Sequence, residues 1–343
     1  MAYQNVGTPR FYIDLGQYYS VTGIYTPIAG ANFGEINPQI LASLNPTNTQ
    51  TYSGWGSTFA TRNNLTPITY IAFLGHDIAT ERGRCYPEWA GANQDGSYNI
   101  SDHYSITVDE VVNFTNNVNQ EHDGFSIATF TGDEDYPYIR GVMNVDSNND
   151  AINGNHDGGK IGAISMGTFY DMPHSPDLNL KLSYEYDGVK TIQSKGGATL
   201  SNAPYTKPAD WGDRGAWQLG SDEDGRGISN FRSGRRVWDL SFSYLADSDI
   251  FPKVAATSNY ESDDEVTDPS ENTLLDGTDF FSVVWNRTMA GHLPFIFQPD
   301  GGGASPNNSP DQFAICRFDM KTLTYDQVAN NVYNVKLKIR EVW

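Results

Sequence analysis

The sequence has few basic residues, few cysteines and no long hydrophobic run, and each shortage excludes a class of protein. Its 22 Lys and Arg are outnumbered by 42 Asp and Glu, which gives a formal net charge of −20. Nucleic-acid binding requires clustered positive charge, so this balance argues against sequence-specific binding of nucleic acid. An acidic surface also keeps subunits apart and soluble before they assemble.

Only two cysteines occur, Cys85 and Cys316, and neither belongs to a Cys-x-x-Cys pair. Cys316 lies in the alternating sequence QFAICRFD, which predicts a small buried side chain rather than half of a disulfide. No run approaches the roughly 18 apolar residues of a membrane-spanning helix, so we expect no membrane partner. The start, MAYQNVGTPRFYIDLG, lacks a basic segment followed by an apolar core, which predicts no secretory signal and folding in a reducing cytoplasm.

Motifs of the common enzyme classes are also missing. The six histidines form neither His-Glu-x-x-His nor a metal-finger spacing with the cysteines. Neither a Gly-x-Ser-x-Gly elbow nor a Gly-x-x-x-x-Gly-Lys-Ser/Thr loop is present. His76, in LGHDI, is interpreted as a hydrogen-bonded turn residue, with a ligand or pH-sensing role as the alternative. We expect a protein that is not an enzyme and has no catalytic or cofactor-binding residue, although a glycosidase-type carboxylate pair stays open.

Aromatic and turn-forming residues dominate what is present. Aromatic residues make up 13% of the 343 residues, with 20 Tyr, 17 Phe and 7 Trp, while charged residues reach only 19%. Gly, Pro, Asn, Asp and Ser recur at short intervals between aromatic-rich runs. This pattern predicts an all-β fold, and the length predicts two β-sandwich or barrel domains.

Strict alternation of apolar and polar residues predicts the clearest strands. These strands cover 235–245, 312–319 and 333–341, and a continuous apolar run predicts another strand at 69–78. Alternation at 179–185 predicts a half-buried strand. We expect its buried face to hold Leu180, Leu182 and Tyr184, and a single C-terminal core to hold Trp238, Leu240, Phe242, Phe295, Phe297, Leu337 and Ile339.

A short helix is predicted between two of these strands. The sequence Asp-Gly-Thr-Asp at 276–279 can cap a helix over 280–290, and Gly291 can end it. Its buried face would contain Phe280, Val283, Val284 and Arg287. The segment GGGASPNNSP at 301–310 contains no large hydrophobic residue to anchor it and predicts a long mobile loop.

The polar stretch VDSNNDAINGNHDGGK, at 145–160, predicts a domain boundary. The boundary divides the chain into an N-terminal β domain at 1–158 and a C-terminal β domain at 159–343.

The same stretch has the spacing of a calcium-binding loop. Asp146, Asn148 and Asp150 form the Asp-x-Asn-x-Asp opening, and Asp157 occupies the twelfth position. The sixth position is Ala151, where the sharp turn of such a loop requires glycine. Two interpretations stay open, a weak calcium site formed by the three aspartates and the asparagine, and a polar interdomain loop.

Four segments of the second half of the chain follow a distinctive order: SGRRVWDLSFSYLADSD (233–249), GHLPFIFQPD (291–300), QFAICRFD (312–319) and YNVKLKIREVW (333–343). In pattern and order they resemble tailed-phage virion proteins of the tail and baseplate, of the distal-tail or tail-tube type. Two further segments, 161–190 and FLGHDI (73–78), resemble uncharacterised structural proteins of marine phages. The resemblance implies a C-terminal tail-tube-like barrel with one short helix, forming a symmetric homo-oligomeric ring, often a hexamer. It further implies synthesis in the host cytoplasm, a final place in the virion tail, and other tail proteins as partners.

Two other functions stay open, a carbohydrate-binding adhesin or receptor-binding protein and a capsid decoration protein. The aromatic residues Tyr205, Trp211 and Trp217 have the chemistry to stack on sugar rings. For assembly, the segment 24–56 contains a single charged side chain, Glu35. A surface so poor in charge is expected to lie at inter-subunit contacts.

Overall fold

Strands far outnumber helices in the computed structural model, so the predicted all-β fold is confirmed. The structure describes residues 7–29, 50–51, 57–63, 65–76, 78, 83–108, 110–112, 114, 124–145, 160–185, 190–202, 235–251, 277–303, 305–309 and 312–342.

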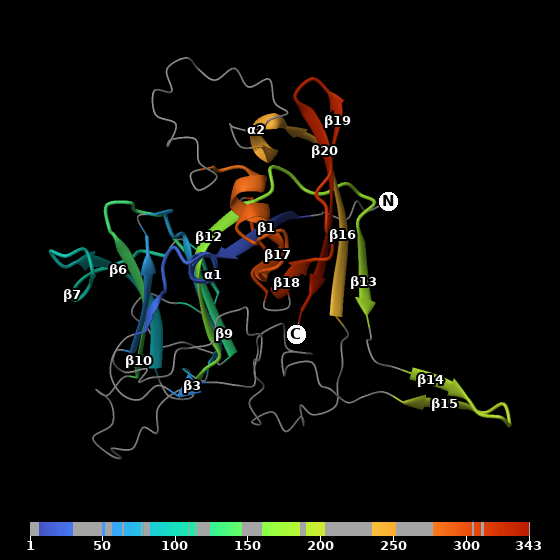
Figure 1. Ribbon diagram of the computed structural model, residues 1–343, viewed down its shortest axis with the longest axis horizontal. Helices are drawn as coiled ribbons and strands as arrows, with labels where there is room; N and C mark the ends of the chain where they lie inside the picture. Colours follow the sequence, from blue (N-terminus) through green and yellow to red (C-terminus); the bar gives the residue numbers. More distant parts are fainter. Residues whose placement is uncertain are drawn as a thin grey trace.

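An antiparallel sheet of eleven strands forms the body of the protein (Figure 1). Its strand order is β13–β16–β20–β18–β17–β1–β12–β5–β9–β8, and β19 pairs with β20. The strands are β1 (Thr8–Asp14), β5 (Tyr70–His76), β8 (Glu110–Val112), β9 (Gly124–Thr129), β12 (Ala163–Asp171), β13 (Lys181–Glu185), β16 (Arg235–Ala246), β17 (Phe295–Gly302), β18 (Ala314–Phe318), β19 (Tyr325–Ala329) and β20 (Val332–Glu341).

A second sheet of five strands has the order β2–β4–β10–β6–β7 and lies on the left of Figure 1. Its strands are β2 (Ile28–Ala29), β4 (Ser57–Arg62), β6 (Gly83–Ala92), β7 (Tyr98–Ser105) and β10 (Tyr138–Val145). Two smaller pairs join β3 (Gln50–Thr51) to β11 (Lys160–Ile161) and β14 (Lys190–Gln193) to β15 (Thr199–Asn202). The helices are α1 (Leu15–Thr22), α2 (Asp247–Ile250) and a π-helix (Phe281–Asn286).

Strand β1 joins the two halves of the large sheet, because it pairs with β12 on one side and with β17 on the other. Strands from both sides of the predicted domain boundary therefore share one sheet. The boundary itself lies in the segment 146–159, outside the described residues. The division into domains 1–158 and 159–343 stays a prediction.

The predicted C-terminal core is confirmed. All seven expected residues belong to one buried cluster, and none is more than 5% exposed. The alternation along β16 and β20 explains this, because successive side chains of a strand point to opposite faces of a sheet. Phe11 and Ile13 of β1 complete the same cluster, so the first strand of the chain helps to build the core of its last strands.

The large sheet curls around a second buried face. The rings of Phe125, on β9, and Phe313, next to β18, are 5.5 Å apart, although four strands lie between β9 and β18 in the sheet order. The cluster on this inner face includes Tyr12, Tyr70 and Ile296. Curvature lets one sheet bury both of its faces over its central strands.

The strands predicted at 235–245, 312–319 and 333–341 are confirmed as β16, β18 and β20. The segment predicted as a helix has the expected cap, because the backbone N–H of Ser282 donates to Asp279 Oδ1 at 2.9 Å. The expected face is also buried. The helix is of the π type, however, and the N–H of Ala290 donates to the Trp285 carbonyl, five residues earlier. Over so short a segment, the spacing of buried residues does not distinguish an α-helix from a wider turn.

Candidate functional site

Strand β13 forms one edge of the large sheet and is exposed on both faces. Leu182 and Tyr184, which the alternation placed on a buried face, are 46% and 54% exposed, so that part of the prediction is wrong. Leu182 pairs with Trp238 and Tyr184 with Arg236, so both side chains continue the face that holds the C-terminal core. They stay exposed because β13 lies beyond β16, which is the last strand of this face whose side chains are covered by other residues.

The opposite face of β13 is polar, and its charged side chains lie next to charged residues of β16 and β20. Lys181 lies opposite Asp239 on β16, and Glu185 forms an ion pair with Arg340 of β20 at 2.8 Å. In the described part of the chain, the outer edge of β13 has no partner strand. The strand therefore presents unpaired backbone groups next to an apolar face, which is the arrangement that recruits another strand.

A hairpin formed by β14 and β15 follows β13 and projects from the body at the lower right of Figure 1. We call residues 190–202 the arm. Its turn is closed by the N–H of Ser194, which donates to the Ala198 carbonyl at 2.8 Å, and Gly197 supplies the positive φ of 82° that the turn requires. An isolated two-stranded hairpin is marginally stable in water, so the arm needs a surface to pack on.

One cross-strand pair of the arm is apolar and open to solvent. Ile192 and Leu200 lie directly opposite each other across the hairpin and are 63% and 60% exposed. Leu178, before β13, is 77% exposed. Tyr244 on β16 is 79% exposed, because a register shift between β16 and β20 interrupts the alternation there. Six of the twelve exposed large hydrophobics in the described residues thus lie on or just before β13, on the arm, or on β16: Leu178, Leu182, Tyr184, Ile192, Leu200 and Tyr244.

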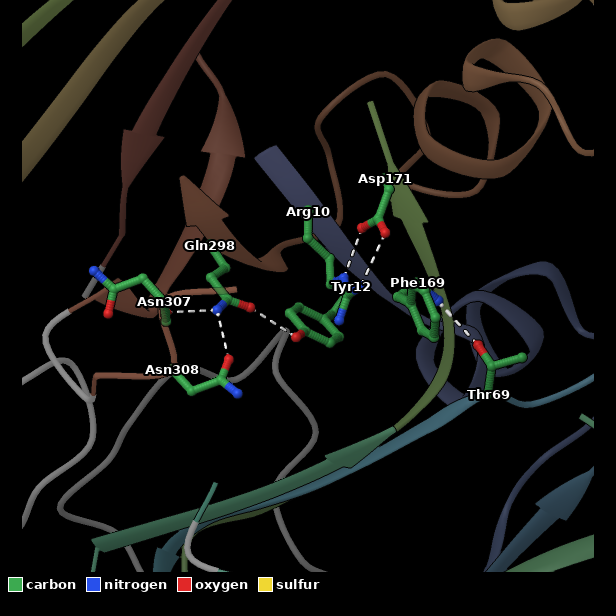
Figure 2. A network of polar contacts seen from close by, with 8 residues as sticks. All are labelled: Arg10, Tyr12, Thr69, Phe169, Asp171, Gln298, Asn307 and Asn308. Carbon is green, nitrogen blue, oxygen red and sulfur yellow. Dashed lines mark hydrogen bonds and ion pairs between the residues drawn. The ribbon is translucent and has the colours of Figure 1, made fainter. Parts of the chain in front are cut away.

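A second candidate site is a polar network on the curled face of the sheet, shown in Figure 2. Arg10 donates to both carboxylate oxygens of Asp171, at 2.6 and 2.9 Å, and its guanidinium lies 4.4 Å from the ring centre of Phe169. The Tyr12 hydroxyl donates to Gln298 Oε1 at 2.8 Å. These contacts fasten β1 to both neighbouring strands, β12 and β17. Their role is structural, since each of the groups is already paired within the chain.

The hydrogen bonds of Gln298 overturn one part of the prediction for the loop at 301–310, namely that the loop has no anchor. Its buried side-chain amide donates to the Asn307 carbonyl at 2.8 Å and to Asn308 Oδ1 at 3.1 Å (Figure 2). The loop was expected to have no anchor within the chain, because it lacks hydrophobic residues. A buried glutamine from the preceding strand supplies the anchor instead.

Asp14 is a buried carboxylate at the junction of β1 and α1. It caps the helix by accepting the backbone N–H of Gln17 at 2.9 Å and the side-chain amide of Gln17 at 3.0 Å. Burial raises the pKa of Asp14 from 3.8 to about 6, and the hydrogen bonds from Gln17 offset only part of this effect.

The raised pKa of Asp14 predicts a pH-dependent stability. Between about pH 4 and pH 6 the folded protein binds more protons than the unfolded chain, so stability falls as pH rises through this window. Asp14→Asn removes the cost of the buried charge and keeps the cap. We expect it to raise the free energy of unfolding by about 1–3 kcal/mol at pH 7.5, and by much less at pH 4.

Urea titrations of Asp14→Asn and the unmodified protein at both pH values measure this difference. The introduced amide can donate to Gln17 Oε1, which is buried and has no partner in the described residues. A difference that is the same at pH 4 and pH 7.5 would contradict a titrating Asp14.

The calcium ligands expected from the sequence, Asp146, Asn148, Asp150 and Asp157, lie outside the described residues. Within those residues no group of three or more His, Cys, Asp or Glu side chains is placed to hold a metal ion. We expect EDTA to change the melting temperature by less than about 1 °C, because a fold with these cores does not depend on that loop. A fall of several degrees, reversed by calcium alone, would establish the site.

The other residues that the sequence singled out have structural roles or lie outside the described residues. Cys85 and Cys316 are both buried and form no disulfide, so the prediction for Cys316 is confirmed. His76 is buried at the end of β5 and forms a 2.9 Å hydrogen bond with Ser126 Oγ, in agreement with the structural interpretation. Outside the described residues lie Tyr205, Trp211, Trp217 and most of the segment 24–56.

Comparisons with known proteins leave the family open. No family model and no curated protein matches the chain. Among solved structures, a DUF4466 family protein from Parabacteroides merdae matches 92% of this chain and 98% of its own, with 9% sequence identity and a TM-score of 0.19. That score is too low to support an inference about fold or function. Among the helices of the described residues, none is long and apolar enough to cross a membrane.

Proposed function

We propose that the protein is a structural component of a tailed-phage virion that assembles into a symmetric ring or tube of the tail or baseplate. The observation that supports this best is the open apolar edge formed by β13 together with the arm. Proteins that remain monomeric shorten, charge or cover such edges, because an exposed edge recruits other strands. The edge strand β13 is short and has one charged face, but its other face is apolar and uncovered, as expected of a surface that another subunit buries.

Identical copies are the simplest partners for this surface. Repetition of one contact around a symmetry axis buries the edge of every subunit at once. The net charge of −20 keeps isolated chains soluble until that contact forms. The resemblance of the segments at 233–249, 291–300, 312–319 and 333–343 to tail proteins supports the virion as the place of assembly.

Three measurements test this proposal together. Negative-stain images of the purified protein should show rings or tubes. Antibodies raised against it should label the tails of purified virions of the phage that encodes it, and mass spectrometry should detect it there. A protein that remains monomeric and is absent from the virion by mass spectrometry would overturn the proposal. Labelling of the head instead would favour a capsid decoration protein.

A specific observation also favours the adhesin as a second candidate. Tyr104 is 47% exposed and contacts Tyr136, with ring centres 5.0 Å apart, and Tyr136 stacks parallel on Trp89. An exposed aromatic ring supported from below is suited to stack on a sugar. If the adhesin interpretation holds, the protein should bind a glycan on an array, and Tyr104→Ala should reduce that binding at least tenfold without lowering the melting temperature.

A further inference from the structure

We propose that the arm of one subunit docks on residues 21–28 of the next subunit and extends the sheet there at strand β2. This inference rests on the proposed assembly and identifies the contact that would produce it. The partner is a second copy of this chain, and the surface that receives the arm is different from the surface that offers it.

The receiving surface is an uncharged apolar segment beside an open strand edge. Val21, Ile24 and Ile28 are 48%, 45% and 37% exposed, and no charged residue occurs from 15 to 29. Helix α1 ends at Gly23, whose φ is 74°, and the chain then enters β2. Strand β2 pairs with β4 and is the last strand of the five-stranded sheet in the described residues.

The arm has the complementary properties. The exposed pair of Ile192 and Leu200 needs an apolar surface, and both outer edges of the hairpin are open in the described chain. Addition of a hairpin strand to β2 would satisfy backbone groups on both sides and cover the two apolar sets together.

Charge favours another copy as the partner. The arm contains Lys190 and Lys195 and no acidic residue, so with a net charge of −20 for the whole chain the remainder carries −20 − 2 = −22. Whole chains of this charge repel one another, but the arm is opposite in sign to the rest of every copy, so the arm itself is attracted to a neighbouring acidic chain.

The positions of the two surfaces favour a head-to-tail contact. In Figure 1 the arm projects at the far right along the longest axis, whereas α1, which precedes the receiving segment, lies left of centre. Contacts between two different surfaces of identical subunits are heterologous, and they close into rings when the rotation between neighbours permits.

Disulfide trapping tests the contact directly. Both native cysteines are buried and form no disulfide, so an engineered cysteine on the surface reacts selectively. We would prepare Ile192→Cys and Ile28→Cys as separate proteins, confirm that each keeps its melting temperature, and oxidise them alone and mixed. The expected result is a disulfide-linked dimer in the mixture, at least tenfold more abundant than in either protein alone.

Each other outcome has a defined meaning. Cross-linking of Ile192→Cys with itself would indicate an arm-to-arm contact and overturn the inference. Cross-linking of Ile192→Cys with Leu182→Cys, and not with Ile28→Cys, would place the arm on a neighbouring β13 and overturn it as well. If rings form but no trap succeeds, the docking inference fails and the proposed function stands. If neither variant nor the unmodified protein assembles, both fail.

Discussion

Truncation of Phe242 to alanine should lower the free energy of unfolding by about 3–5 kcal/mol, the range measured for large-to-small changes in well-packed cores. Phe242 is fully buried near the middle of β16 and faces Val335 on β20. The cavity left by its ring would lie inside the buried C-terminal cluster, whose packed aromatic and aliphatic side chains have little freedom to fill it. Urea unfolding followed by tryptophan fluorescence measures the loss.

Tyr244→Ala is the matched control for this change. It removes an aromatic ring from the same strand, two residues away, but that ring is 79% exposed. We expect its effect to stay within about 0.5 kcal/mol, as for other surface substitutions. If both substitutions lowered the free energy of unfolding equally, this result would contradict the assignment of Phe242 to the buried core.

The second large effect is expected on assembly. The double substitution Ile192→Asp with Leu200→Asp should weaken association by roughly 10²–10⁴-fold. Burial of an aliphatic side chain contributes about 1.5–3 kcal/mol, so loss of two removes about 3–6 kcal/mol, and each 1.4 kcal/mol corresponds to about a tenfold change in affinity. Sedimentation velocity over a range of concentrations measures the shift from oligomer to monomer.

The opposite face of the arm supplies a control with the same charge. Thr191 and Ser201 pair across the hairpin, one position along from the apolar pair, and both are exposed. Thr191→Asp with Ser201→Asp adds the same two charges but leaves Ile192 and Leu200 in place. Assembly should then change only a few-fold. Equal loss in both double variants would show that charge on the arm matters and its apolar face does not.

The strands and core of the C-terminal half could be predicted from sequence because they follow from backbone geometry. A period of two places Trp238, Leu240 and Phe242 on one face of a strand wherever that strand lies in a sheet. The same rule correctly placed Leu182 and Tyr184 on the face of β13 that continues the core. It wrongly predicted that this face is buried. Burial of Leu182 and Tyr184 depends on whether another layer covers the edge, and no local pattern contains that information.

Other features depend on contacts between distant parts of the chain. Strand β1 was not predicted, although it is central, because its partners β12 and β17 lie more than 140 residues away in sequence. The anchoring of the 301–310 loop by Gln298 and the raised pKa of Asp14 likewise arise only when distant strands pack. The arm is visible in the sequence only as a short polar stretch with Ile192 and Leu200, and its exposure had no sequence signal.

The mass of the unmodified protein in solution tests the central claim most directly. Light scattering coupled to size-exclusion chromatography, from dilute to concentrated samples, compares the particle with the chain mass of 38.0 kDa. A closed ring predicts a single species at a fixed integer multiple of that mass, which persists as concentration rises. A mass of 38.0 kDa at every concentration would contradict assembly through the β13 edge and the arm.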